Sequence, residues 1–195
     1  MKLFLSCAAL ALLLSSCGNF FDSFDESEIP GYTRDWLRGE QGQTLTFRNG
    51  AGQTRTLRVR RREELMTSSG RTGTSYYQVL NVRIEDTAPD SLLSVSLEGN
   101  SNKVNVSHHG VAWGAINTHE NGRKTYVESY RNATTITGSM AAEDTTLAGR
   151  QYRFVGRIRG PITAHPTDTV TAVYISRYEG VIGFMTKRAG LWHRD

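Results

Sequence analysis

The sequence predicts a mainly β protein: a single antiparallel β-sandwich or open half-barrel of about ten strands, with at most one short helix. Beyond Arg38, apolar and polar residues alternate with a period of two, and clusters of Gly, Asn and Ser separate the alternating runs at short intervals. The hydrophobic content over the 195 residues is 38%, which is modest. A thin core of this kind suits strands that each bury only one face.

The first predicted strands form a hairpin. Leu45 and Phe47 alternate with polar residues before the turn Asn49-Gly50-Ala51-Gly52, and Leu57 and Val59 alternate after it. The same alternation continues along the chain. It predicts further strands at residues 76–85, 93–97, 104–106, 111–117, 123–130, 151–158, 169–177 and 181–187.

The start of the chain has the features of a secretory leader. Lys2 provides a basic residue, Leu3 begins an apolar run that ends at Leu14, and the small residues Ser15 and Ser16 follow. At about 1.5 Å per residue, this run is too short to span a bilayer as a helix. We therefore expect the leader to be removed rather than to anchor the protein.

The motif Leu14-Ser15-Ser16-Cys17 resembles the bacterial lipobox. The resemblance implies that the leader is cut before Cys17, whose thiol takes a diacylglyceryl group and whose new α-amine is acylated, typically with palmitate. Gly18 after the cysteine implies the outer membrane rather than retention at the inner membrane. Two or more acyl chains give stable anchoring where one chain does not. The alternatives are an uncleaved signal anchor or an ordinary leader cut near Ser15.

These features divide the chain into a lipoprotein signal peptide at residues 1–16, a lipidated flexible tether at 17–33 and an antiparallel β domain at 34–195. Acidic residues and the Pro30-Gly31 break favour the tether. Acidic residues after the cysteine resemble a surface-export signal of Bacteroidota lipoproteins, although a solvated acidic linker explains them equally. Within the domain, only Ser139–Leu147 has a composition that suits a short helix.

The cysteine count excludes thiol and disulfide chemistry in the domain, because Cys7 is lost with the leader and Cys17 carries the lipid. The histidines lack His-x-His or His-Glu-x-x-His spacing, so we expect no metal site and no cofactor. No nucleophile elbow or phosphate-binding loop is present. A pair of carboxylates from distant strands remains open, since such pairs leave no sequence motif.

Arginines are the most informative charged residues in a chain with 23 Lys and Arg against 19 Asp and Glu. Arg58, Arg60 and Arg62 share the strand face opposite Leu57 and Val59, because side chains alternate along a strand. The same alternation in the predicted strand at 151–158, extended by one residue, places a second set of arginines on one face. This second set comprises Arg153, Arg157 and Arg159.

The planar guanidinium group of arginine binds phosphate, sulfate and carboxylate through paired hydrogen bonds. The two sets therefore predict a face that binds anionic glycans or lipid head groups. The alternative is that acidic residues on neighbouring strands neutralise the arginines in ordinary cross-strand pairs. The acids considered for this role are Glu63, Glu64, Glu85, Glu98 and Glu128.

The C-terminal stretch from Tyr174 to Phe184 is similar to a Tyr-x-Ser-Lys/Arg-x-x-Gly-x-Val-x-Phe ending of small outer-membrane lipoproteins of the Bacteroidota type. That family has no established activity. The stretch predicts a strand, a turn that Gly180 permits, and a following strand in which Ile182 and Phe184 pack in the core.

Together these features predict a lipid-anchored protein of the cell envelope that acts as a non-catalytic binding or scaffold module, not as an enzyme, with the membrane as partner and no nucleic acid. One alternative is a carrier of lipids or other hydrophobic ligands, which would need an apolar cavity of roughly 300 Å³ or more. A second alternative is a hydrolase with distant carboxylates, which would show convergent carboxyl groups with raised pKa values.

Overall fold

The computed structural model describes residues 26–70, 73–88, 92–119, 125–132, 135–160 and 168–195. These residues form one 14-stranded sheet, antiparallel apart from the short strand β1, and one helix, α2 (Gly31–Arg34). The prediction of a mainly β protein is confirmed. The strands are β1 (Glu26–Ser27), β2 (Thr44–Asn49), β3 (Thr54–Gly70), β4 (Gly73–Asp86), β5 (Ser94–Asn100), β6 (Lys103–His108), β7 (Val111–Asn117), β8 (Tyr126–Asn132), β9 (Thr135–Ala141), β10 (Glu143–Leu147), β11 (Arg150–Arg159), β12 (Val170–Ser176), β13 (Gly180–Thr186) and β14 (Gly190–Arg194).

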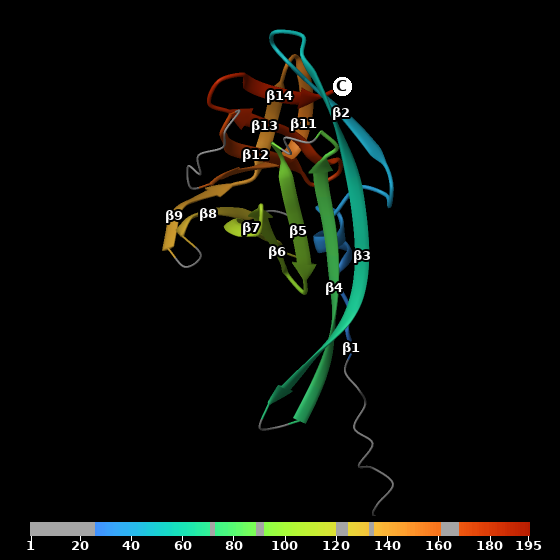
Figure 1. The fold of residues 1–195 in the computed structure, drawn as a ribbon. Helices are drawn as coiled ribbons and strands as arrows, with labels where there is room; N and C mark the ends of the chain where they lie inside the picture. Colours follow the sequence, from blue (N-terminus) through green and yellow to red (C-terminus); the bar gives the residue numbers. More distant parts are fainter. Residues whose placement is uncertain (1–25, 71–72, 89–91, 120–124, 133–134, 161–167) are drawn as a thin grey trace, which may run out of the picture.

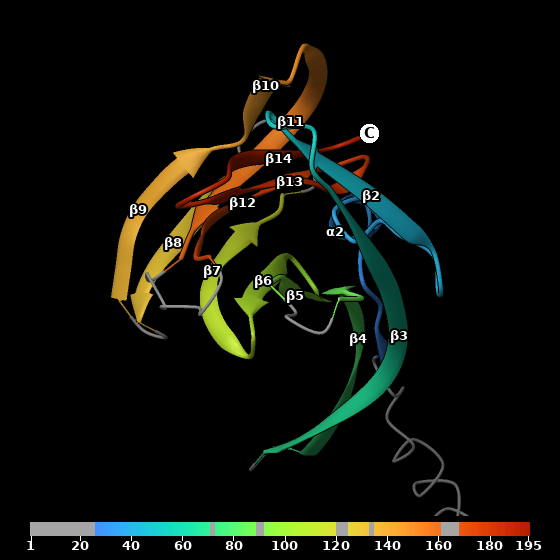
Figure 2. The same cartoon turned by 45° about the horizontal axis from the view of Figure 1, so that its top comes forward.

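The sheet follows the order β10-β11-β12-β13-β14-β2-β3-β4-β5-β6-β7-β8-β9, and β1 pairs with β4 beside this path. The C-terminal strand β14 pairs with β2, so Trp192 lies opposite Asn49 in the middle of the sheet (Figure 1). The edge strands β9 and β10 lie at opposite ends of the path, yet only Ala142 separates them in the sequence. The sheet therefore coils until its two edges approach each other, and among the described strands these edges do not pair (Figure 2).

The structure contains more strands than the sequence predicted. Residues Ser139–Leu147, which suited a short helix, belong instead to β9 and β10, apart from Ala142 between the two strands. Their backbone groups pair with β8 and β11, and this pairing overrides the helix propensity of Met140 and Ala141. Strands β1 and β14 were also not predicted.

The packed body begins before residue 34, where the domain was expected to start. Ser27 of β1 pairs with Tyr77 of β4, and both Ile29 and Thr33 are buried. The Thr33 hydroxyl donates a hydrogen bond of 2.7 Å to the carbonyl oxygen of Ser101. Residues 26–33 of the expected tether thus pair with or pack against the sheet, as β1 and the start of α2. The expected signal peptide and lipidation at Cys17 lie outside the described residues.

Within the described part of the chain, no helix has the length and apolar character needed to cross a bilayer.

Strands β3 and β4 continue beyond the pairing site of β1 as a two-stranded ribbon that projects from the body (Figure 1).

The main core lies inside the coiled sheet and contains side chains from both of its halves. Trp36, Trp113, Phe47 and Phe184 are its largest fully buried members. Strand β11 crosses close to β7 and β8: a Cβ atom added at Gly114 of β7 would lie 2.9 Å from the Cγ2 atom of Ile158 on β11. Glycine at this position therefore allows β11 to pack against β7.

A second apolar cluster lies among the C-terminal strands. Arginine side chains cover two of its aromatic rings: the Arg150 guanidinium lies 5.0 Å from the centre of the Tyr152 ring, and that of Arg157 lies 5.5 Å from the centre of the Tyr174 ring. The cluster consists of Leu147, Tyr152, Val155, Ala172, Tyr174 and Ile182.

Candidate binding surfaces

The β3 arginines lie on the exposed face of the sheet, as the alternation predicted. Leu57 and Val59 are fully buried, whereas the side chains of Arg60 and Arg62 are 67% and 80% exposed. Arg58 pairs in register with Glu85 of β4 on the same exposed face. The three guanidinium groups are therefore accessible to a ligand from solution.

These arginines are only partly neutralised. Arg60 and Arg83 share a single carboxylate: the Nε atoms lie 2.9 Å and 2.6 Å from the two oxygens of Glu85. Arg62 uses its Nε atom to pair with Glu64. Among the described residues, neither Arg60 nor Arg62 forms an ion pair with a second carboxylate. One carboxylate shared by two guanidinium groups leaves net positive charge on this face.

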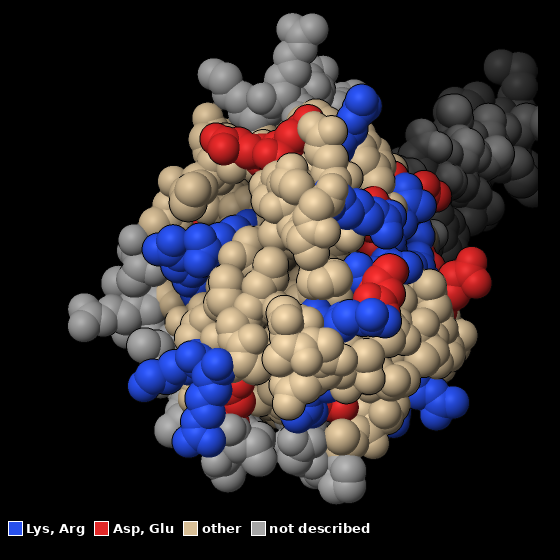
Figure 3. Space-filling model, turned by 90° about the horizontal axis from the view of Figure 1, so that it is seen from above, with Lys and Arg blue, Asp and Glu red and all other residues tan. Residues whose placement is uncertain are grey.

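The second arginine set does not join the first. Four strands, β12, β13, β14 and β2, lie between β11 and β3 in the sheet. Seen from above, lysines and arginines form separate groups around the molecule, several of them beside acids (Figure 3). The β3 and β11 arginines therefore belong to different surfaces.

The prediction that Arg153, Arg157 and Arg159 share one face is wrong. Phe154 has a positive φ of 47° and belongs to a β-bulge, which adds one residue to the strand. As a result, Tyr152 and Val155 both pack in the second cluster although they are three positions apart. Arg153 then lies on the face opposite to that of the other two arginines, and Arg157 covers Tyr174.

A groove opens beside the β3 arginines on the exposed face of the sheet. Its volume is about 810 Å³, and Arg60, Arg62 and Arg83 line one side of it. A neighbouring compartment of about 340 Å³ lies toward β8 and is lined by Tyr130, among others. Ser96 and Ser107 line both compartments, so we treat them together as the outer groove.

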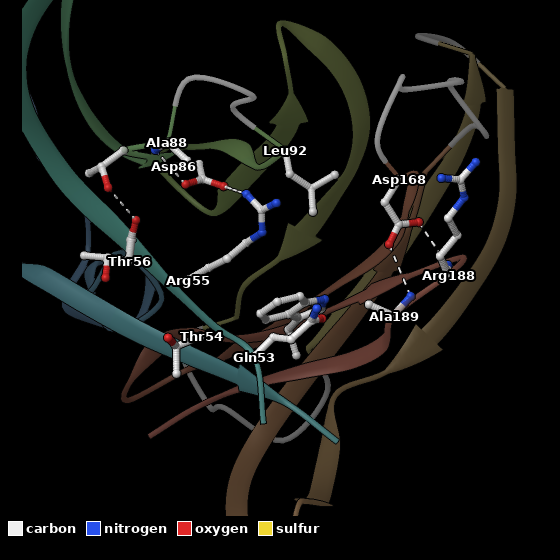
Figure 4. Close-up of a pocket in the computed structure, with 12 residues that line it drawn as sticks. Gln53, Thr54, Arg55, Thr56, Asp86, Ala88, Leu92, Asp168, Arg188 and Ala189 are labelled. Atoms are coloured by element: carbon white, nitrogen blue, oxygen red, sulfur yellow. Dashed lines mark hydrogen bonds and ion pairs between the residues drawn. The ribbon is translucent and has the colours of Figure 1, made fainter. Parts of the chain in front are cut away.

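A second cleft, of about 580 Å³, lies at one end of the sheet (Figure 4). We call it the end cleft. Arg55 of β3 and Asp86 of β4 form an ion pair in its wall, and the Asp86 side chain is only 1% exposed. The Arg55 guanidinium also lies 5.8 Å from the centre of the Trp192 ring. Both charged groups belong to the core-facing side of the sheet, since Arg55 is in phase with Leu57.

Asp168 lines the other side of the end cleft and binds backbone groups of the β13–β14 turn. Its carboxylate accepts hydrogen bonds from the backbone N–H groups of Arg188 at 2.9 Å and Ala189 at 3.2 Å. Burial alone would raise the pKa of Asp168, but hydrogen bonds from the Thr186 hydroxyl and from backbone amides outweigh it and hold the pKa below its usual value. The group is thus an anchored anion that holds the turn.

Asp168 therefore lacks the main property of a general acid. Such an acid needs a pKa raised toward neutrality, whereas the pKa of Asp168 is lowered. Sequence reasoning did not single out Arg55, Asp86 or Asp168. The phase of Arg55 with Leu57 and Val59 was an available signal, but nothing in the sequence brings Asp86 and Asp168 to one cleft.

Among the described residues, no three His, Cys, Asp or Glu side chains lie close enough together to hold a metal ion. His108 packs instead against Trp113, with 4.6 Å between the ring centres, and its Nε2 atom lies 3.3 Å from the carbonyl oxygen of Leu92. His165 lies outside the described residues.

Comparison with protein-family models, with curated proteins and with solved structures found no match to this chain. Its function must therefore be inferred from its own residues and their arrangement.

Proposed function

We propose that the chain is an outer-membrane lipoprotein, anchored through Cys17, that acts as a non-catalytic binding module for anionic groups. The observation that carries this proposal is the set of accessible guanidinium groups beside the outer groove, where Arg60 and Arg83 share the single carboxylate of Glu85. Sulfate, carboxylate and phosphate groups are the natural ligands of such a surface. They occur on acidic glycans and on lipid head groups alike.

The arrangement of side chains favours this function over that of a lipid carrier. The space inside the coiled sheet is filled by its own residues, including Phe47, Phe184 and Trp192, whose neighbouring ring centres lie 5.6 Å apart. The outer groove and the end cleft both have charged side chains in their walls. A hydrolase is supported less well, because the carboxylate of Asp168 is held as an anion by the β13–β14 turn.

We further propose that the coiled sheet is an open half-barrel rather than a sandwich. The support is the unbroken strand order from β10 to β9, in which no gap divides the sheet into two layers. Strand β11 packs across β7 and β8 where the coil turns back on itself, at Gly114 and Gly156.

The anchor is tested by replacing Cys17 with alanine. We expect incorporation of labelled palmitate to be lost completely, because the thiol that receives the diacylglyceryl group is absent and the leader is not cut at this site. Intact-mass measurement of the membrane-extracted protein checks the same point. The matched control is Cys7→Ala, which should leave labelling unchanged because Cys7 lies in the removed leader. Labelling that persists without Cys17 would disprove the anchor.

The binding surface is tested by changing Arg58, Arg60 and Arg62 to glutamine together. Each cationic side chain near an anionic surface contributes about 1 kcal/mol, so the triple variant should bind roughly a hundredfold more weakly. Retention on immobilised heparin and on vesicles with anionic lipids measures the effect and separates the glycan source from the lipid source.

A variant with the same change of charge provides the control for this experiment. Replacing Arg153, Arg157 and Arg159 by glutamine removes three cations from strand β11, outside the outer groove. This variant should keep most of the retention. If both triple variants lose the same amount on both matrices, the binding follows overall charge and the β3 surface has no special role.

A further inference from the structure

The outer groove extends well beyond the arginines, across the exposed face of five neighbouring strands. Arg60, Arg83, Ser96, Ser107 and Ala112 are paired in register from β3 to β7. Directly paired residues share a face, so these side chains form one row across the sheet. At about 4.8 Å between strands, the row is about 19 Å long, and β8 adds one further spacing.

Side-chain length explains the shape of the groove. Long guanidinium side chains stand at the β3–β4 end of the row, whereas serine and alanine occupy β5, β6 and β7. The aromatic side chain of Tyr130 lines the far end on β8. The groove therefore runs perpendicular to the strands, with cations at one end and an aromatic ring at the other.

The floor of the groove offers uncharged hydrogen-bonding groups. The Ser96 hydroxyl donates to the Asn81 side-chain oxygen at 2.9 Å, and the Ser107 hydroxyl has no hydrogen bond with any described residue. In the second compartment, Glu98 and Lys103 carry opposite charges. Net positive charge is therefore confined to the arginine end, and the rest of the groove suits a ligand rich in hydroxyl groups.

We propose that the outer groove binds a chain of sugars that carries carboxylate or sulfate groups. The anionic groups bind Arg60, Arg62 and Arg83, and the sugar hydroxyls contact Ser96 and Ser107 along the floor toward Tyr130. This assignment rests on the proposed anion-binding function and names the ligand that the groove accommodates. A flat lipid surface would contact the tips of the arginines but leave the floor uncontacted, whereas an elongated polar chain fills the groove.

The proposal predicts a dependence on ligand length. With the lipidated protein in detergent micelles, we expect affinity for size-fractionated heparin oligosaccharides to rise about tenfold from the disaccharide to the octasaccharide, because contacts along the groove add to those at the arginines. Isothermal titration calorimetry measures the affinity of each size. Equal affinity for both sizes would overturn the groove assignment while leaving the anion-binding function intact.

Variants that block the floor of the outer groove test whether the gain in affinity with ligand length arises there. Ser107→Trp fills the floor and should abolish the gain with length, while binding of the disaccharide stays within about twofold of the unchanged protein. Ser68→Trp makes the same change on the projecting ribbon, outside the groove lining, and should keep the full gain. Ser96→Phe provides a second block if the tryptophan variant does not fold, as judged by circular dichroism.

The outcomes separate the two proposals. If glutamine at Arg58, Arg60 and Arg62 abolishes disaccharide binding and Ser107→Trp removes only the length dependence, both proposals are supported. If Ser107→Trp leaves the octasaccharide affinity unchanged, the sugar chain does not occupy the groove. If the unchanged protein binds anionic vesicles and no oligosaccharide, the ligand is a lipid head group, and the glycan assignment is wrong although the anion-binding function stands.

Discussion

Replacing Trp113 by alanine is expected to lower the free energy of unfolding by about 3–5 kcal/mol. The side chain is fully buried in the main core, and its ring packs so closely on the backbone that a Cβ atom at Gly160 would lie 2.0 Å from it. Strands surround the site, so the cavity left by the indole cannot collapse without disturbing their pairing. Urea unfolding of the purified protein, followed by circular dichroism, measures the loss.

Val111 of the same strand provides the control for Trp113. Its side chain is 41% exposed, so Val111→Ala should change the unfolding free energy by less than about 1 kcal/mol. If Trp113→Ala costs no more than this control, the tryptophan does not belong to the cooperative core. A second outcome, an altered slope of the unfolding curve, would mean that the denatured or native state has changed its compactness.

Replacing Arg55 by methionine is expected to lower the free energy of unfolding by about 3 kcal/mol, the lower end of the cost of breaking a buried ion pair. The change leaves the carboxylate of Asp86 nearly buried without its cation. One oxygen of Asp86 still accepts a hydrogen bond of 3.0 Å from the backbone N–H of Ala88, which limits the cost. The same unfolding experiment measures the effect.

A double-mutant cycle shows whether the ion pair of Arg55 and Asp86 is responsible for the loss of stability. Adding Asp86→Leu to Arg55→Met removes the unpaired charge, so the double variant should recover part of the stability lost in the single variant. Arg62→Met is the control for an exposed pair, because Arg62 and Glu64 are 80% and 37% exposed, and it should cost less than about 1 kcal/mol. Additive costs in the cycle would show that Arg55 acts through other contacts, such as the Trp192 ring.

The alternation of apolar and polar residues was sufficient to predict the fold class, because it reports which face of a strand is buried. It predicted the hairpin around Asn49 and the exposure of Arg58, Arg60 and Arg62. The glycine in the C-terminal stretch predicted the turn at Gly180, whose φ is 73°. These features depend on short stretches of chain, and local patterns determine them.

The alternation of apolar and polar residues did not predict the β-bulges. The extra residue at Phe154 changes the phase of β11 and separates Arg153 from Arg157. A register shift between β12 and β13 has the same effect on Ile182 and Phe184, which were expected to share one core. Ile182 packs in the second cluster and Phe184 in the main core. A bulge depends on how two strands meet, so neither strand alone reveals it.

For a similar reason, the sequence predicted the β3 arginines but neither the outer groove nor the end cleft. The β3 arginines followed from a single strand. The outer groove depends on the register of β3 to β7, and the end cleft depends on residues from β3, β4, β14 and the segments that connect strands. The register of strands across a whole sheet depends on pairing between residues that are far apart in the sequence. No local sequence pattern reports it.

The pairing of β14 with β2 has a consequence for how the protein matures. Because a polypeptide is synthesised from its amino end, β2 becomes available early and β14 late. Until the final residues arrive, β2 lacks its neighbour on that side and stays open to pairing with other chains. Joining the two halves of the sheet is thus a late step of high contact order, which makes slow folding the expected behaviour of this chain.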